Sequence, residues 1–517
     1  MLRLLALLCL LASSAPAAEV RSVRVSAFDG SGRPMSAQDL LRYMAPAPYE
    51  ESGVTPAESG LYATDLEGNT VGGRPWWSRQ GSDIVWQWTG PEHVRFTLPW
   101  PIAKDGFSTV TLDGNGAGYR DAQEILLNEE IAATAYRMMK DALKERTTLW
   151  QPPYKPSRDV DRMLERVMRL TADAHAAKTP RKRAARFDEA LTAVSQAWQQ
   201  ILFEHGRQVV LDPEFGKRLR WGLSLDETLV ERIDEYERVA SVVADTGADW
   251  IRLVFRADPK DFTFSKESSF SLYDDLVKRL TSKKLEIMGS VLDSLLWPKG
   301  LTPEEYAQRS RNLAAHFKDS IRSWEVASEP NGSWLGDPKS PLPPETVLLA
   351  VQKAVVEVKR VDRGLETVAT LNWSEGTAKD DFHPLPAWLR WATARGFGAG
   401  IDVIGVNLYP HRHPVGIAFD PMFREVKKFL PGKRLMVGGV SFGDDDKVLR
   451  GYWWLAPGNV LDARKDLLNL FLGASAAVPD GIGGGFFWAT LDKMFDRKGR
   501  PTGLFKAYKD TLRTLRK

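Results

Sequence analysis

Cysteine is almost absent from this chain, in which Cys9 is the only one among 517 residues. It falls in a leader-like segment, where a basic residue precedes a short apolar run and Ala15-Pro16-Ala17 offers an A-x-A cleavage pattern. We therefore predict that residues 1–18 are a secretory signal peptide and that the protein is secreted or periplasmic. Without Cys9 the mature chain would have no disulfide, so its stability must come from its core.

Long apolar runs and a charge of one sign are lacking too. The apolar stretch of the leader is far shorter than the roughly 20 residues of a membrane span. No later stretch is long and apolar enough, so we predict no membrane insertion after removal of the signal. With 70 basic and 67 acidic residues, the formal net charge of +3 does not indicate a nucleic-acid partner. The basic run from Lys178 to Arg183 is predicted to be a solvated loop between helices.

Motifs of several other protein classes are missing. No phosphate-binding glycine motif, G-x-G-x-x-G or G-x-x-x-x-G-K-[ST], follows the first strand of the C-terminal part, which weakens the case for a doubly wound open sheet. No G-x-S-x-G supports a serine hydrolase. The seven histidines are scattered, and His411-x-His413 lacks a clear third ligand. We predict neither a metal site nor a cofactor.

The N-terminal part contains short alternating segments separated by Gly, Pro and Asp clusters, which is typical of a β-sandwich. We place this domain at residues 19–120, with strands at Val20–Phe28, Asp83–Thr89, His93–Pro99 and Ser108–Leu112. Tryptophans are dense here: Trp76, Trp77, Trp86, Trp88 and Trp100. They are consistent with a carbohydrate-binding module, or with a sandwich core and an interface to the next domain.

From residue 121 the apolar period changes to that of helices. Amphipathic patterns at 126–145, 160–176 and 183–203 predict a helical connecting segment over residues 121–210. From 211 to 517 strand and helix patterns alternate. The predicted strands are Leu219–Leu225, Trp250–Arg256, Leu285–Val291, Trp324–Ala327, Thr367–Leu371, Val403–Tyr409, Leu435–Val440 and Gly485–Trp488. Eight such units predict an α/β fold, a (β/α)8 TIM barrel.

The segment from Ser323 to Trp334, S-W-E-V-A-S-E-P-N-G-S-W, is the most informative. Alternation predicts a strand whose neighbouring side chains face opposite sides. Glu329 stands where the strand ends and Pro330 turns the chain away. A carboxylic acid at the C-terminal end of a barrel strand is well placed for proton transfer.

W-E-V-x-x-E-P resembles the fourth-strand motif, W-x-x-x-N-E-P, of retaining glycoside hydrolases of the TIM-barrel clan A. The resemblance implies that Glu329 is the general acid/base, and it places Ser328 where the family has the Asn that binds the sugar 2-hydroxyl. It extends over the C-terminal part only. It implies a saccharide ligand with β-linkages.

Other strand ends carry residues that the same resemblance makes substrate-binding candidates. Arg252 matches the arginine that lies beneath the catalytic carboxylates, and it is a candidate partner for Glu325. Asn407-x-Tyr409 is similar to the family's H-x-Y, and Trp488 matches the tryptophan on which a sugar ring stacks. Trp373 ends the fifth strand. Four further tryptophans are predicted in loops on the same side: Trp297, Trp334, Trp453 and Trp454.

The seventh strand departs from the family. L-M-V-G-G-V-S-F-G resembles the strand ending I-G-E-F-G, whose Glu is the nucleophile, and in this register Gly439 occupies that position. Retaining enzymes need two carboxylates about 5–5.5 Å apart, inverting ones a pair about 6.5–9.5 Å apart. The run Asp444 to Asp446 is either a replacement carboxylate or a solvated loop.

Two functions remain open from the sequence. The first is a glycoside hydrolase-like protein acting on O-glycosidic bonds of a β-linked poly- or oligosaccharide, with Glu329 as the proton donor. The second is a pseudo-glycosidase without catalytic power that binds saccharide in polysaccharide export or sensing. Glycine at 439 and serine at 328 favour the second.

Overall fold

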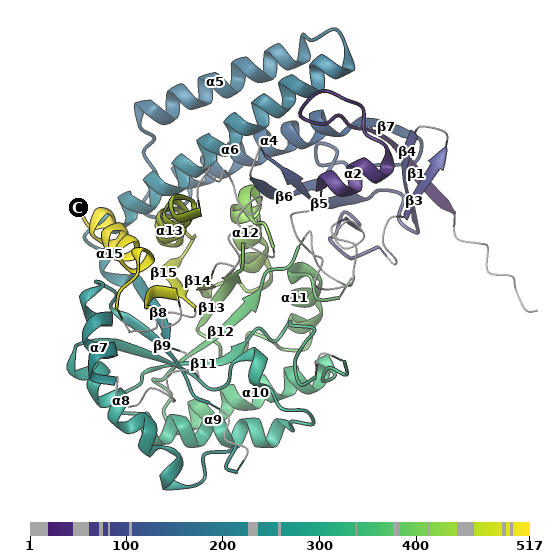
Figure 1. The fold of residues 1–517 in the computed structure, drawn as a ribbon. Coiled ribbons are helices and arrows are strands. Elements are labelled where there is room, and N and C mark those ends of the chain that lie inside the picture. Colours follow the sequence, from purple (N-terminus) through teal and green to yellow (C-terminus); the bar gives the residue numbers. More distant parts are fainter. Residues whose placement is uncertain are drawn as a thin grey trace, which may run out of the picture.

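The computed structural model describes residues 19–44, 61–71, 76–80, 83–102, 106–225, 236–256, 260–337, 339–375, 380, 382–410, 413–441, 460–488, 493–496 and 500–517. Figure 1 shows three long helices running over a C-terminal barrel, with N-terminal strands beside them.

The C-terminal part forms a closed barrel of eight parallel strands in the order β10-β11-β12-β13-β14-β15-β8-β9, as predicted. The strands are β8 (Arg220–Leu225), β9 (Trp250–Val254), β10 (Glu286–Ser290), β11 (Ser323–Ser328), β12 (Glu366–Asn372), β13 (Val403–Leu408), β14 (Arg434–Val440) and β15 (Gly481–Phe487). They are almost entirely buried because helices cover them outside.

A helix follows each of these strands and covers the outside of the barrel, in line with the predicted alternation of strands and helices. These helices are α7 (Tyr236–Asp245), α8 (Ser271–Ser282), α9 (Pro303–Phe317), α10 (Pro344–Val361), α11 (Leu385–Thr393), α12 (Phe419–Phe429), α13 (Val460–Ala476) and α15 (Gly503–Leu515). The start of α9 is set by local chemistry: Thr302 and Glu305 form a reciprocal capping box around Pro303.

Two bulges decide which side chains face the barrel interior. On β11 the register shifts between Glu325 and Ala327, so strict alternation fails there. Glu325 and Ser328 both point inward to Arg252, whereas the sequence pattern put Ser328 on the opposite face from Glu325. A second shift, between Val406 and Leu408 of β13, places an extra residue in β14.

The N-terminal part contains two small sheets, β3-β4-β1-β7 and β2-β5-β6. Their elements are β1 (Val20–Ser26), α2 (Ala37–Met44), β2 (Tyr62–Thr64), β3 (Trp76–Gln80), β4 (Asp83–Thr89), β5 (Arg95–Pro101), β6 (Phe107–Leu112) and β7 (Gln123–Leu126). The two sheets meet through aromatic rings, because Trp86 and Trp88 both contact Phe96 edge-on. A β-sandwich in the strict sense stays a prediction.

The tryptophans of this region do not all serve the role that a carbohydrate-binding module would require. Trp86, Trp88 and Trp100 are at most 1% exposed, so their faces are used in the core and offer no surface platform for a sugar ring. The side chains of Trp76 and Trp77 lie outside the described ones.

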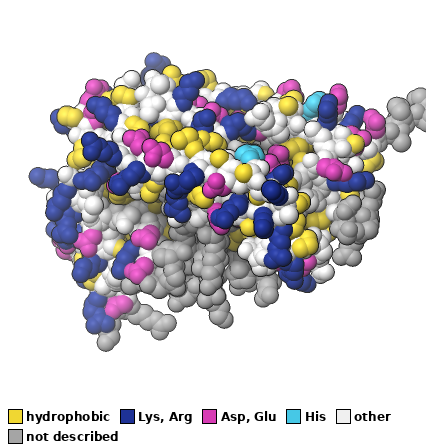
Figure 2. Space-filling model, turned by 90° about the horizontal axis from the view of Figure 1, so that it is seen from above, with side chains coloured by type: hydrophobic (Ala, Val, Ile, Leu, Met, Phe, Trp, Pro, Cys, Tyr) yellow, Lys and Arg dark blue, Asp and Glu magenta, His cyan; other side chains and the backbone are white. Residues whose placement is uncertain are grey.

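Three helices join the N-terminal strands to the barrel: α4 (Leu127–Thr148), α5 (Arg158–His175) and α6 (Pro180–Leu211). The basic run at 178–183 includes the capped start of α6, at Thr179 and Pro180, so it is not merely a loop. Figure 2, a view from above, shows Lys and Arg side chains spread over this face with Asp and Glu among them. Of the helices described, none combines the length and apolarity of a membrane span.

A buried polar cluster fixes the helices to the barrel. Arg146 of α4 is fully buried and pairs with Asp420 of α12, which also accepts a hydrogen bond from Trp198 of α6. His205 of α6 contacts Arg146 at 2.9 Å. Loss of either charge would leave the other buried and unpaired, so α4 and α6 are fixed to the barrel through α12.

Candidate functional site

Glu329 stands one residue beyond β11 in an unusual backbone conformation. Its φ is +48°, a left-handed conformation that costs a non-glycine residue roughly 1–3 kcal/mol. A proline follows, which restricts it further. Hydrogen bonds hold this turn in place: the Glu329 amide donates to Thr370 O at 2.8 Å, and Gly332 N donates to Glu329 O at 2.8 Å. A strained backbone held in place at the end of a strand indicates that it serves to position the side chain of Glu329.

Asn331 fastens the same turn to the neighbouring strand. Its side-chain amide donates to Asn372 O at 2.8 Å, and its side-chain oxygen accepts from Asn372 N at 2.8 Å. The ends of β11 and β12 are therefore held together by a two-bond clamp. Glu329 is positioned by this clamp from one side and by the barrel ladder from the other.

The carboxyl of Glu329 is surrounded by three hydrogen-bonding side chains, one from the turn after β10 and two from the end of β13. Ser294 donates to Oε2 at 2.7 Å, Asn407 donates to Oε1 at 3.0 Å, and Tyr409 also hydrogen-bonds to the carboxyl. Glu329 is only 2% exposed. Burial raises its pKa above the ordinary value and outweighs the lowering effect of these bonds, and the nearby charge of Asp293 raises it further. A carboxyl with such a pKa can remain protonated and give up its proton.

Arg252 lies beneath this carboxyl at the centre of a buried network. Its guanidinium pairs with Glu325 at 2.6 Å and with Asp293 at 3.3 Å. Three hydroxyls share the remaining donors, those of Ser224, Ser290 and Ser328. Burial opposes the charge of Arg252, but Glu325 and Asp293 more than compensate, so the pKa of Arg252 is raised. The predicted partnership with Glu325 is confirmed.

The end of β14 is occupied quite differently. A Cβ built on Gly439 would lie 1.9 Å from Nε1 of Trp488, and a Cβ on Gly438 would lie 2.2 Å from the side-chain oxygen of Asn407. Both contacts are far below a real carbon contact. Gly439 N instead donates to Asn407 Oδ1 at 2.6 Å. The glycine pair thus admits Asn407 and the indole, and Trp488 fills the space where a nucleophile at 439 would begin.

Trp488 connects the two halves of the site. The guanidinium of Arg252 lies 4.6 Å from its ring centre, and Tyr409 meets it edge-on with ring centres 5.8 Å apart. Its indole N–H is buried and makes no hydrogen bond within the described residues. The predicted residues Glu329, Arg252, Asn407, Tyr409 and Trp488 are therefore brought together.

The remaining predicted residues stand less directly at the site. Ser328 is fully buried and its hydroxyl faces Arg252. Trp373 is 5% exposed, and its backbone N–H reaches Asn407 O. Their contact with a sugar stays a prediction. The residues Asp444, Asp445, Asp446, Trp453, Trp454 and His411 lie outside the described part of the chain.

Three residues of the site were not found by sequence reasoning. Asp293 and Ser294 follow β10, and Thr370 donates to Glu325 at 2.6 Å. Asn372 ends β12, where it was expected together with Trp373. Asn372 is 2% exposed and its side-chain oxygen has no hydrogen-bond partner in the described structure. The position of Asp293-Ser294, just past a predicted barrel strand, was the available signal.

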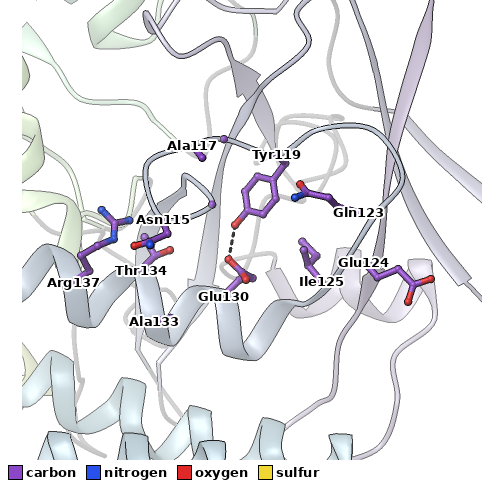
Figure 3. Close-up of a pocket in the computed structure, with 12 residues that line it drawn as sticks. Asn115, Ala117, Tyr119, Gln123, Glu124, Ile125, Glu130, Ala133, Thr134 and Arg137 are labelled. Atoms are coloured by element: carbon purple, nitrogen blue, oxygen red, sulfur yellow. Dashed lines mark hydrogen bonds between the residues drawn. The ribbon is translucent and has the colours of Figure 1, made fainter.

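One of the cavities lies away from the barrel mouth. It measures about 420 Å³ and is lined by the Gly114–Gly118 loop, β7 and α4. Figure 3 shows Tyr119 directed at Glu130 across it, 2.7 Å from hydroxyl to carboxylate. Arg137 in its wall pairs with Asp113. Each of its charged side chains already has a partner, because Glu124 pairs with Arg24 in addition to these two contacts, so nothing there points to a ligand.

The described residues hold no group of three His, Cys, Asp or Glu side chains arranged to bind a metal ion.

Comparisons with known proteins give similarities in fold only. No protein-family model and no curated protein matches the chain. Similar solved structures include a β-glucosidase from Thermotoga maritima in complex with castanospermine, at 13% identity and TM-score 0.43, covering 60% of this chain and 99% of that one. Another is the exo-β-1,4-mannosidase of Opitutaceae bacterium strain TAV5, at 13% identity and TM-score 0.41, covering 57% and 59%. A glucosidase from Croceicoccus marinus aligns at 15% identity and TM-score 0.41, covering 54% and 62%.

Proposed function

We propose that this protein acts on O-glycosidic bonds of a β-linked poly- or oligosaccharide at the barrel mouth, with Glu329 as the general acid. The observation that carries the proposal is the strained, buried Glu329 at the end of β11, held by Ser294, Asn407 and Tyr409. Proton transfer to a leaving oxygen requires an acid that keeps its proton until the bond breaks, and burial raises the pKa of Glu329 in the direction that favours this.

The absence of a carboxylate at Gly439 determines which mechanism this site supports. A retaining mechanism needs a nucleophile, and Trp488 fills the space in which a side chain at 439 would start. We infer an inverting route: Glu329 protonates the leaving oxygen while water adds to the anomeric carbon. The proton of that water passes to a second carboxylate. Asp293 is one candidate, and an aspartate of the run 444–446 is the other.

The second candidate function is saccharide binding without cleavage. It is favoured by the same glycine and indole, because a site from which the nucleophile is excluded can retain its ligand intact. Within the described residues, the side-chain oxygen of Asn372 is an acceptor without a partner and the indole N–H of Trp488 a donor without one, which suits a sugar hydroxyl that both donates and accepts.

The two candidates separate in one experiment. The native protein and Glu329→Gln are incubated with cellotetraose and with mannotetraose, and products are followed by chromatography while binding is measured by calorimetry. Turnover in the native protein that is lost in Glu329→Gln supports the hydrolase. Binding without turnover supports the second candidate, and neither binding nor turnover rejects both.

A chemical rescue tests the role of Trp488. Trp488→Ala opens the space beside Gly439, so azide is expected to enter there, attack the anomeric carbon on the face opposite the leaving group and produce an α-glycosyl azide from an activated aryl β-glycoside, with Glu329 assisting departure. The native protein with azide should give none. Azide product from the native protein would contradict the closed space.

Export is part of the same proposal, since an extracellular or periplasmic location would bring the site to polysaccharide. Detection of a processed chain lacking residues 1–18 in the periplasmic or secreted fraction checks it.

A further inference from the structure

The N-terminal strand β6 reaches the loops that leave the barrel mouth. Thr109 N donates to Val415 O at 3.3 Å, and its hydroxyl lies 2.5 Å from Pro414 O and 3.4 Å from Glu375 O. Pro414 and Val415 follow β13, whereas Glu375 follows β12. One threonine therefore bonds to both loops at once, and it is 1% exposed.

Ser108 adds a second contact that requires a glycine opposite. Its hydroxyl accepts from Ile417 N at 3.3 Å. Gly416 has a φ of +52°, and a Cβ there would lie 1.8 Å from the Ser108 hydroxyl oxygen. The loop after β13 is shaped to receive β6, and Ser108 is fully buried in the contact.

Short stretches of chain connect these contacts to the site. His413 N donates a hydrogen bond to Tyr409 O at 2.9 Å. Because Pro414 is the next residue, this bond links Tyr409 to the carbonyl that Thr109 holds. On the other side, Asn372 is three residues from Glu375. The carboxyl of Glu375 accepts from Leu385 N at 2.5 Å and Ser374 N at 3.2 Å. Burial raises the pKa of Glu375 to about 8, so it is a neutral, fixed part of the loop at pH 7.

We propose that β6 is a brace for the site, in which Thr109 and Ser108 are positioning residues that fix the loops following Asn372 and Tyr409 and so hold Tyr409 on the carboxyl of Glu329. The inference rests on the proposed function for its role, but its structural part is tested without any saccharide. It gives the N-terminal domain a task other than sugar binding of its own.

The chain offers matched variants. Thr109→Val removes the hydroxyl and keeps the volume, whereas Thr109→Ser keeps the hydroxyl. Thr111→Val is the control: Thr111 is two residues along the same strand, and its hydroxyl bonds at 2.8 Å to Thr97 within the same sheet. A merely structural role would make Thr109→Val and Thr111→Val alike.

The decisive readout is the titration of Glu329, followed by carboxyl ¹³C NMR and identified by the signal missing in Glu329→Gln. If the brace holds Tyr409 on the carboxyl, Thr109→Val weakens that bond and raises the measured pKa by roughly 0.5–1. Thr109→Ser and Thr111→Val should match the native protein. Amide exchange of His413 and Ile417 should be about five- to tenfold faster in Thr109→Val alone.

The outcomes separate the brace from the proposed function. A Glu329 titration unchanged by Thr109→Val, or changed equally by Thr111→Val, overturns the brace. Absence of cellotetraose and mannotetraose binding by the native protein rejects the proposed function and leaves the titration result to decide the brace. Where binding occurs, we expect Thr109→Val to weaken it about five- to tenfold with little change in melting temperature.

Discussion

The ends of β11 and β14 face the same barrel mouth, yet they are built in opposite ways. At β11 a strained backbone presents Glu329, and three side chains from other segments hold its carboxyl. At β14 two glycines present no side chain, and an amide and an indole fill the room. The end of β11 therefore holds a carboxyl that several residues support, whereas the end of β14 leaves no room for one.

This difference is more than the loss of one functional group. The side-chain oxygen of Asn407 accepts a hydrogen bond from Gly439 N, and its side-chain nitrogen donates one to Glu329. The backbone at Gly439 therefore helps to orient the carboxyl of Glu329. A simple loss of a nucleophile would leave empty space. Here the space is filled by Trp488, which in turn stacks on Arg252. Restoring a glutamate at 439 therefore requires a change at 488 as well.

The largest effect is expected when the positive charge of Arg252 is removed. Arg252→Met leaves Glu325 and Asp293 buried without a cation, which costs about 3–5 kcal/mol of the free energy of unfolding. Urea denaturation measures it. Arg220→Met, which removes a less buried pair with Glu366, is the control and should cost less. Equal losses would contradict the central place of Arg252.

A smaller effect tests the closed space at β14. Gly439→Ala puts a Cβ into the indole and should destabilise the fold by about 1–3 kcal/mol. In Trp488→Ala the same glycine substitution should cost much less, which gives a coupling of about 1–2 kcal/mol in a double-mutant cycle. Additive losses would mean that the two residues do not compete for one space.

Glu329 should give the stability of the fold a characteristic dependence on pH. Because the pKa of Glu329 is raised in the folded state, the folded protein holds one more proton than the unfolded chain between about pH 4.3 and that raised value. Rising pH then lowers stability by about 1.4 kcal/mol per pH unit over that window. Glu329→Gln removes this part of the slope, so the difference between native and variant should shrink toward pH 4. A parallel pair of stability curves would contradict a protonated Glu329.

The smallest effect concerns one bond to the carboxyl. Tyr409→Phe removes a hydroxyl that bonds to Glu329, and we expect a loss of about 0.5–1.5 kcal/mol in stability or in saccharide affinity. Tyr306→Phe serves as the control, since its hydroxyl bonds to Val326 O away from the mouth. A change in affinity in both variants alike would argue against a special role for Tyr409.

The barrel could be predicted from the sequence because the signals for its strands and helices lie within a few residues of one another. Apolar runs of strand length, the capping box at Thr302 and the turn at Pro330 each act within a few residues. The predicted barrel strands therefore lie within two residues of the observed ones, except β15, which begins four residues earlier than predicted. The sequence also singled out Glu329, Arg252, Asn407, Tyr409 and Trp488, which the structure brings together.

What the sequence could not predict depends on three-dimensional register and space. A bulge in β11 turned Ser328 toward Arg252, and no alternation pattern reveals an inserted residue. The indole of Trp488 reaches Gly439 across neighbouring strands that are far apart in the sequence. Likewise, the bonds from Thr109 to Glu375 and Pro414 join residues about three hundred positions apart. The strands β2, β3 and β7 were missed because each is short.

The most direct test of the account is the anomeric form of the first product. Cellotetraose or mannotetraose is mixed with the native protein in an NMR tube, and the anomeric protons are followed before mutarotation. The account predicts an α-anomer first, formed by water on the face opposite Glu329, and no product with Glu329→Gln. A β-anomer first would contradict it, because retention demands the nucleophile for which Trp488 leaves no room.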